Sequence, residues 1–64
     1  MKSIIVKDTL YCLDNLWWAE IEKKYEDSAH IHLHYTNGHG LTIYWLEPDK
    51  AMDILKEIQK ILAE

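Results

Sequence analysis

The sequence predicts an α+β domain: an antiparallel meander of four to five strands with one C-terminal amphipathic helix packed on one face. Alternating apolar and polar residues recur through the first 46 positions, as expected of half-buried strands. Asn37-Gly38 lies between two such runs and is a strong β-hairpin signal. After Pro48, apolar residues recur with the spacing of one helix face.

No linker, repeat or low-complexity segment interrupts these patterns, so residues 1–64 are expected to form one domain. The strands are expected at residues 3–7, 10–13, 16–25, 29–36 and 40–46, and the helix at residues 48–63. Residues 16–25 are the hardest to assign, because their Glu, Lys and Ala content would also suit a helix. The alternation of Trp17, Ala19 and Ile21, together with the neighbouring strands, favours a strand.

The register of the hairpin follows from its side-chain pattern. A two-residue Asn37-Gly38 loop would place imidazoles opposite aliphatic side chains, which a half-buried sheet does not favour. A three-residue loop that ends at Gly38, with this glycine in the left-handed region, makes both faces consistent. The resulting pairs are Leu33–Leu41, Ile31–Ile43, His32–Thr42 and His30–Tyr44.

The helix is expected to begin at Glu47-Pro48, where proline suits the first turn. Its apolar stripe consists of Ala51, Ile54, Leu55, Ile58, Ile61 and Leu62. One helix can cover only one face of the sheet. The face expected to be covered carries Ile31, Leu33, Leu41, Ile43 and Trp45, joined by Trp17, Ala19 and Ile21.

The opposite, uncovered face is the candidate binding or oligomer surface. Its expected residues are Trp18, Glu20, Glu22, His30, His32, His34, Tyr44 and Leu46. Trp and Tyr combine a large apolar area with a polar tip, the chemistry of interface anchors. The sequence therefore favours a protein-binding or self-association patch on this face.

Metal binding is the alternative for the same face. His30, His32 and His34 share one side of a strand, and two imidazoles at this spacing can serve as zinc ligands. The alternative function is therefore a metal- or small-ligand-binding module. The principal interpretation requires no metal and no cofactor.

Catalysis is not expected. Cys12 lies among apolar neighbours and reads as a buried small hydrophobe. The chain has two glycines and neither a phosphate-binding loop nor a serine in an elbow motif. The expected protein is not an enzyme.

Size and charge narrow the partners further. A chain of 64 residues has a core that supplies only about 3–5 kcal/mol, and one cysteine cannot form an internal disulfide. A homodimer or higher homo-oligomer is the commoner supplement to such a core. Seven basic against eleven acidic residues, with no arginine, disfavour nucleic acid. With no membrane span and no signal peptide expected, the predicted location is the cytoplasm.

The segment from Leu10 to Leu16 (Leu-Tyr-Cys-Leu-Asp-Asn-Leu), the later Asn-Gly turn and the closing Glu-Pro helix form a pattern across most of the chain. The pattern resembles small uncharacterised bacterial and phage proteins that have a β-meander followed by a C-terminal helix. The resemblance implies this fold and a bacterial or phage-infected host cell, and it transfers no active residue. Small acidic phage proteins that inhibit host defence or regulatory proteins are similar in size and charge. The sequence thus predicts a non-enzymatic protein-binding module, with such an inhibitor as its specific form.

Overall fold

The chain forms two antiparallel sheets and one helix in the computed structural model. The structure describes the backbone of residues 1–64 and the side chains of residues 1–23 and 26–64. The elements are β1 (Ser3–Val6), β2 (Thr9–Cys12), β3 (Leu16–Tyr25), β4 (Ser28–Tyr35), β5 (Gly40–Leu46) and α1 (Pro48–Ala63). Strands β1 and β2 pair only with each other, whereas β3, β4 and β5 form a three-stranded sheet in that order.

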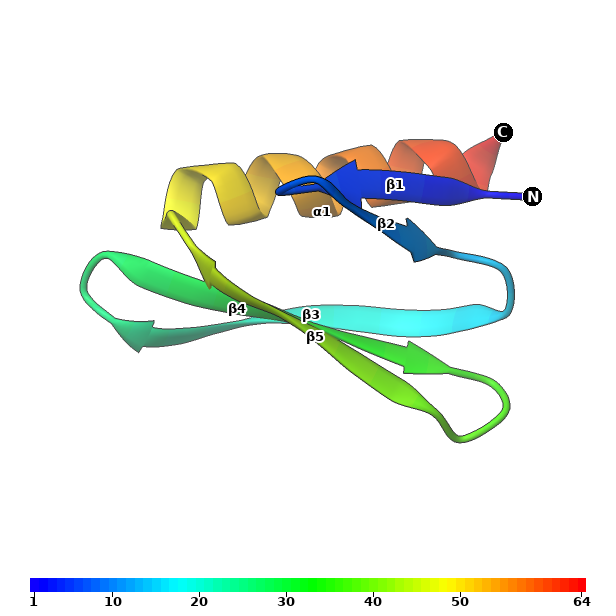
Figure 1. Cartoon of the computed structure of the whole chain (residues 1–64), viewed down its shortest axis with the longest axis horizontal. Helices are drawn as coiled ribbons and strands as arrows, with labels where there is room; N and C mark the ends of the chain where they lie inside the picture. The colour runs from blue at the N-terminus through cyan, green and yellow to red at the C-terminus, as the bar shows by residue number, and fades with distance from the viewer.

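The α+β class is confirmed, but the expectation of one continuous meander is wrong. The β1–β2 hairpin does not extend the larger sheet; it lies on the same side of that sheet as α1 (Figure 1). Val6 and Leu13 are buried in the core beside the sheet residues Ile31 and Ile43. Because α1 cannot cover three strands alone, the hairpin buries more apolar surface by lying over the sheet than by lengthening it.

The core lies between the three-stranded sheet and this second layer. Its buried residues are Val6, Leu13, Ala29, Ile31, Leu33, Ile43, Leu46, Ala51 and Ile58. They come from the hairpin and the segment after it, from β4 and β5, and from the inner stripe of α1. Tyr11 of β2 and Leu16, Ala19 and Ile21 of β3 are partly buried against this core, so every element of the chain contributes to it.

Two lysines fix the hairpin at its ends. Lys2 Nζ donates to the carbonyl oxygens of Leu62 and Glu64, at 3.1 and 2.8 Å, at the C-terminal end of α1. Lys7 Nζ donates to the carbonyl oxygens of Tyr44 and Trp45, at 3.2 and 2.5 Å. A cation at a helix C-terminus is favourable because the last carbonyls have no partner within the helix.

The β4–β5 turn has the predicted three-residue loop. Tyr35 N–H donates to His39 O at 3.0 Å, and Gly38 has a φ of 88°, which a glycine adopts at little cost. The predicted pairs of Leu33 with Leu41 and of Ile31 with Ile43 are both present. The pair of His32 with Thr42 is present as well. The predicted register is confirmed over this part of the sheet.

The same register fails beyond Ile43, where β5 contains a bulge. Ile31 pairs with Ile43 but Ala29 pairs with Leu46, so both Tyr44 and Trp45 lie opposite His30. Trp45 has a φ of 58°, in the left-handed region. The predicted pair of His30 with Tyr44 alone is therefore wrong.

The bulge reverses the faces of the next two residues. Trp45, expected on the covered face, has its ring against His30, and Leu46, expected on the uncovered face, is buried in the core. Physically, the extra residue interrupts the two-residue side-chain period.

Trp17 was also expected under the helix, but its side chain is 72% exposed. A register shift between Leu16 and Trp18 separates it from the regular part of β3.

Helix α1 begins with Pro48 and presents Ala51 and Ile58 as its buried residues. Asp49 in the first turn and Lys60 in the last turn complement the helix dipole. Among the described residues, no helix is long and apolar enough to cross a membrane.

The segment that leaves the hairpin is held by Asp14. Its carboxylate accepts a hydrogen bond from Lys2 N–H at 3.1 Å, and this bond is the main reason that the pKa of Asp14 lies below its usual value of 3.8. Because folding lowers this pKa, Asp14 stabilises the fold above about pH 4 and loses that effect as the carboxyl becomes protonated at lower pH.

We expect Asp14→Asn to lower the urea midpoint of unfolding at pH 7. The difference from the wild-type chain should shrink as the pH falls below 4, because the wild-type carboxyl then becomes neutral as well. Urea titrations at pH 7 and pH 3 measure this. Asp53→Asn, on the exposed side of α1, is the control with the same charge change. An equal effect of the two substitutions at pH 7 would contradict the role of Asp14.

Candidate functional site

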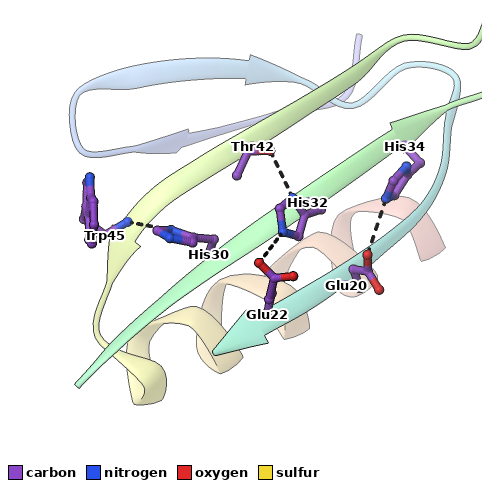
Figure 2. A network of polar contacts seen from close by, with 7 residues as sticks. All are labelled: Glu20, Glu22, His30, His32, His34, Thr42 and Trp45. Atoms are coloured by element: carbon purple, nitrogen blue, oxygen red, sulfur yellow. Dashed lines mark hydrogen bonds and ion pairs between the residues drawn. The ribbon is translucent and has the colours of Figure 1, made fainter. Parts of the chain in front are cut away.

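The three histidines of β4 lie on the sheet face opposite α1 and the hairpin, with their partners on both neighbouring strands (Figure 2). We call this surface the histidine face. It consists of Trp18, Glu20 and Glu22 of β3, His30, His32 and His34 of β4, and Thr42, Tyr44 and Trp45 of β5. Seven of the eight predicted surface residues are in this set; Leu46 is not, and Trp45 takes its place.

His32, at the centre, uses both ring nitrogens. Its Nδ1 lies 3.0 Å from Thr42 Oγ1, and its Nε2 lies 3.4 Å from Glu22 Oε1. Thr42 is directly opposite His32, whereas Glu22 is diagonal to it across β3. The ring is therefore held in one orientation by contacts with strands on both sides.

His34 is held by stacking. Its ring lies 3.7 Å from that of Trp18, centroid to centroid, with 9° between the planes. Its Nε2 is buried and forms no hydrogen bond with any described side chain, the nearest acidic oxygen being Glu20 Oε1 at 3.7 Å.

His30 is the one buried imidazole, with only 4% of its surface exposed. Its Nδ1 accepts a hydrogen bond from Trp45 N–H at 3.1 Å. The ring makes edge contacts with Tyr44 and Trp45, at centroid distances of 5.0 and 5.1 Å. His30 thus supports both the bulge backbone and the two aromatic rings beside it.

The aromatic side chains lie at the two ends of the histidine row. Trp18 is 44% exposed beside His34, and Tyr44 and Trp45 are 58% and 60% exposed beside His30. The sequence identified Trp18 and Tyr44 but missed Trp45. Residues 44–46 contain no glycine or other bulge signal, so only the contact of the Trp45 ring with His30 reveals this side chain's position.

The histidine row is the part of the chain that the sequence analysis considered for metal binding. No group of three or more His, Cys, Asp or Glu side chains among the described residues could hold a metal ion. His30 and His32 already use ring nitrogens for contacts within the sheet. The predicted metal candidates His30, His32 and His34 therefore share a face without converging on one point.

Cys12 is exposed, which contradicts the interpretation as a buried hydrophobe. Most residues of strand β2 are exposed to solvent. The Cys12 thiol contacts Asp14 Oδ2 at 3.6 Å. The Cys12 carbonyl accepts a hydrogen bond from the hydroxyl of Tyr35, and burial raises the pKa of that tyrosine. Among the interactions of the described residues, no histidine contacts the thiol.

Comparisons of the chain with protein-family models, curated proteins and solved structures found no match. The function is therefore inferred from the histidine face itself.

We expect His30→Ala to lower the free energy of unfolding by about 2–4 kcal/mol, because it creates a cavity and removes the imidazole that accepts the hydrogen bond from Trp45 N–H. Guanidinium denaturation measures this loss. His39→Ala is the matched control, since His39 is exposed in the β4–β5 turn and should change stability by less than about 0.5 kcal/mol. Equal losses for both variants would refute the structural role of His30.

Proposed function

We propose that this chain is a non-enzymatic protein-binding module that contacts its partner through the histidine face. The observation that carries the proposal is the placement of three exposed aromatic side chains, Trp18, Tyr44 and Trp45, at the two ends of the row of three imidazoles. Trp and Tyr dominate the binding energy of protein interfaces because they bury much area and lose little conformational freedom.

The contacts within the face support this proposal. Trp18 stacks on His34, and the rings of Tyr44 and Trp45 lie against His30. Side chains already held in place lose less entropy when a partner binds. The surface is thus prepared for binding before the partner arrives.

The charge of the face suits a basic partner. Glu20 and Glu22 are about half exposed along its β3 side, and the whole chain carries a formal net charge of −4. Complementary charge raises the rate of association and selects the partner. Catalysis has less support, because His30 and His32 direct ring nitrogens at their own sheet rather than into a cleft.

Self-association through the histidine face is the form of this function that needs no second protein. A two-fold dimer would bury Trp18, Tyr44 and Trp45 of both copies and would supplement a small core. The more specific role, a phage-type inhibitor of a host defence or regulatory protein in the cytoplasm, is supported by the chain's size and acidic charge.

We expect sedimentation equilibrium to detect a dimer of the wild-type chain at pH 8, and the double variant Trp18→Ala/Tyr44→Ala to remain monomeric. The same variant should lose any partner that the wild-type chain captures from the source cells. The reason is that both substitutions remove exposed aromatic rings from the proposed binding surface.

Leu10→Ala is the control, because Leu10 is an exposed apolar residue of the hairpin, outside the histidine face. Circular dichroism first establishes that each variant is folded. A folded double variant that has the same sedimentation mass as the wild-type chain and captures the same partners would show that the histidine face is not the binding surface.

A further inference from the structure

We propose that the outer edge of β3 binds an extended segment of a partner protein as an added strand, and that this segment alternates basic and apolar residues. The proposal rests on the proposed protein-binding function and specifies the partner's chemistry. Its basis is the difference between the two edges of the sheet, together with an apolar groove and exposed carboxylates beside the β3 edge.

The two edges of the three-stranded sheet are protected differently. At the β5 edge, Lys7 Nζ donates hydrogen bonds to the carbonyl oxygens of Tyr44 and Trp45, and the bulge distorts the strand. Strand β3 pairs only with β4, and its register is regular from Trp18 to Lys23. Every second residue of this stretch therefore directs its backbone N–H and C=O away from β4, as a template for another strand.

An apolar groove runs beside this edge, between β3 and α1. It has a volume of about 440 Å³, and its lining includes Trp17, Ala19, Met52, Leu55, Ile58 and Leu62. Trp17 is 72% exposed in this lining, and Met52 and Leu62 are also exposed. A strand added to β3 would direct every second side chain toward this groove, where apolar residues would be buried.

The other side of the same edge is acidic. Glu20 and Glu22 are two residues apart on the histidine face, with side chains 52% and 47% exposed. The nearest distance from the Glu20 carboxylate to His34 is 3.7 Å, beyond hydrogen-bond range, so it can still accept a strong bond from a lysine or arginine. Basic residues at alternate positions of an added strand have the matching spacing of about 7 Å.

The same charges argue against a second copy of this chain as the occupant. In the registers centred on Glu20 or Ile21, antiparallel pairing of β3 with β3 of another copy would bring Glu20 of one strand opposite Glu20 or Glu22 of the other. Like charges opposite each other on neighbouring strands are destabilising. Charged residues on an edge strand are also a common protection against self-pairing. A basic segment meets no such repulsion.

The test uses a short acetylated and amidated peptide in which lysine and valine alternate, with the fluorescence of the chain's own tryptophans as the signal. A second peptide carries glutamate in place of lysine. In two further peptides, the backbone amide nitrogens are N-methylated, in one peptide at every lysine and in the other at every valine. Because alternate residues of a strand direct their N–H groups to opposite edges, strand addition needs only one of these two sets.

We expect the lysine peptide to bind more tightly than the glutamate peptide, and only one of the two N-methylated peptides to lose binding. Glu20→Lys should weaken binding of the lysine peptide about five- to tenfold. Glu57→Lys, with the same charge change on the exposed side of α1, should leave it nearly unchanged.

Equal binding of the two N-methylated peptides would overturn strand addition, and equal binding of the lysine and glutamate peptides would overturn the basic partner. A wild-type dimer that the lysine peptide dissociates, and that Trp18→Ala/Tyr44→Ala leaves intact, would assign the edge to a second copy and would also overturn the proposal. The proposed function is tested separately by Trp18→Ala/Tyr44→Ala. If the wild-type chain binds none of the peptides but the double variant loses the partner, strand addition is overturned and the histidine face is retained as the binding surface.

Discussion

The hydrogen bond from Trp45 N–H to His30 Nδ1 is the interaction on which the arrangement of the sheet depends. It holds the bulge in which Tyr44 and Trp45 lie together opposite His30. The bulge directs Trp45 to the histidine face and Leu46 into the core, just before α1 begins at Pro48. A bond between a buried side chain and the backbone thereby determines both the core and the surface.

The two faces of this sheet have different surroundings. The inner face is covered jointly by α1 and the β1–β2 hairpin, which two lysines fix at the ends of α1 and β5. The outer face is left for the aromatic rings and imidazoles, which hold one another in place. These side chains form the acidic, aromatic surface that we propose as the binding face.

Local patterns in the sequence predicted the local structure well. Side-chain alternation placed His30, His32 and His34 on one face, and a consistent register predicted the three-residue loop with Gly38 in the left-handed region. Contacts between distant segments were not predictable in this way. The hairpin lies over the sheet because of the apolar area that α1 leaves uncovered, and Trp45 departs from the alternation because of His30. Neither effect leaves a signal in the residues nearby.

The most direct test is a scalar coupling across the hydrogen bond between the Trp45 amide nitrogen and His30 Nδ1, measured by NMR on ¹⁵N-labelled protein at neutral pH. A resolved coupling between these two nitrogens is the predicted result, since the donor and acceptor lie 3.1 Å apart. A sharp Trp45 amide resonance without coupling to His30 would contradict the bulge, and with it the placement of Trp45 on the histidine face.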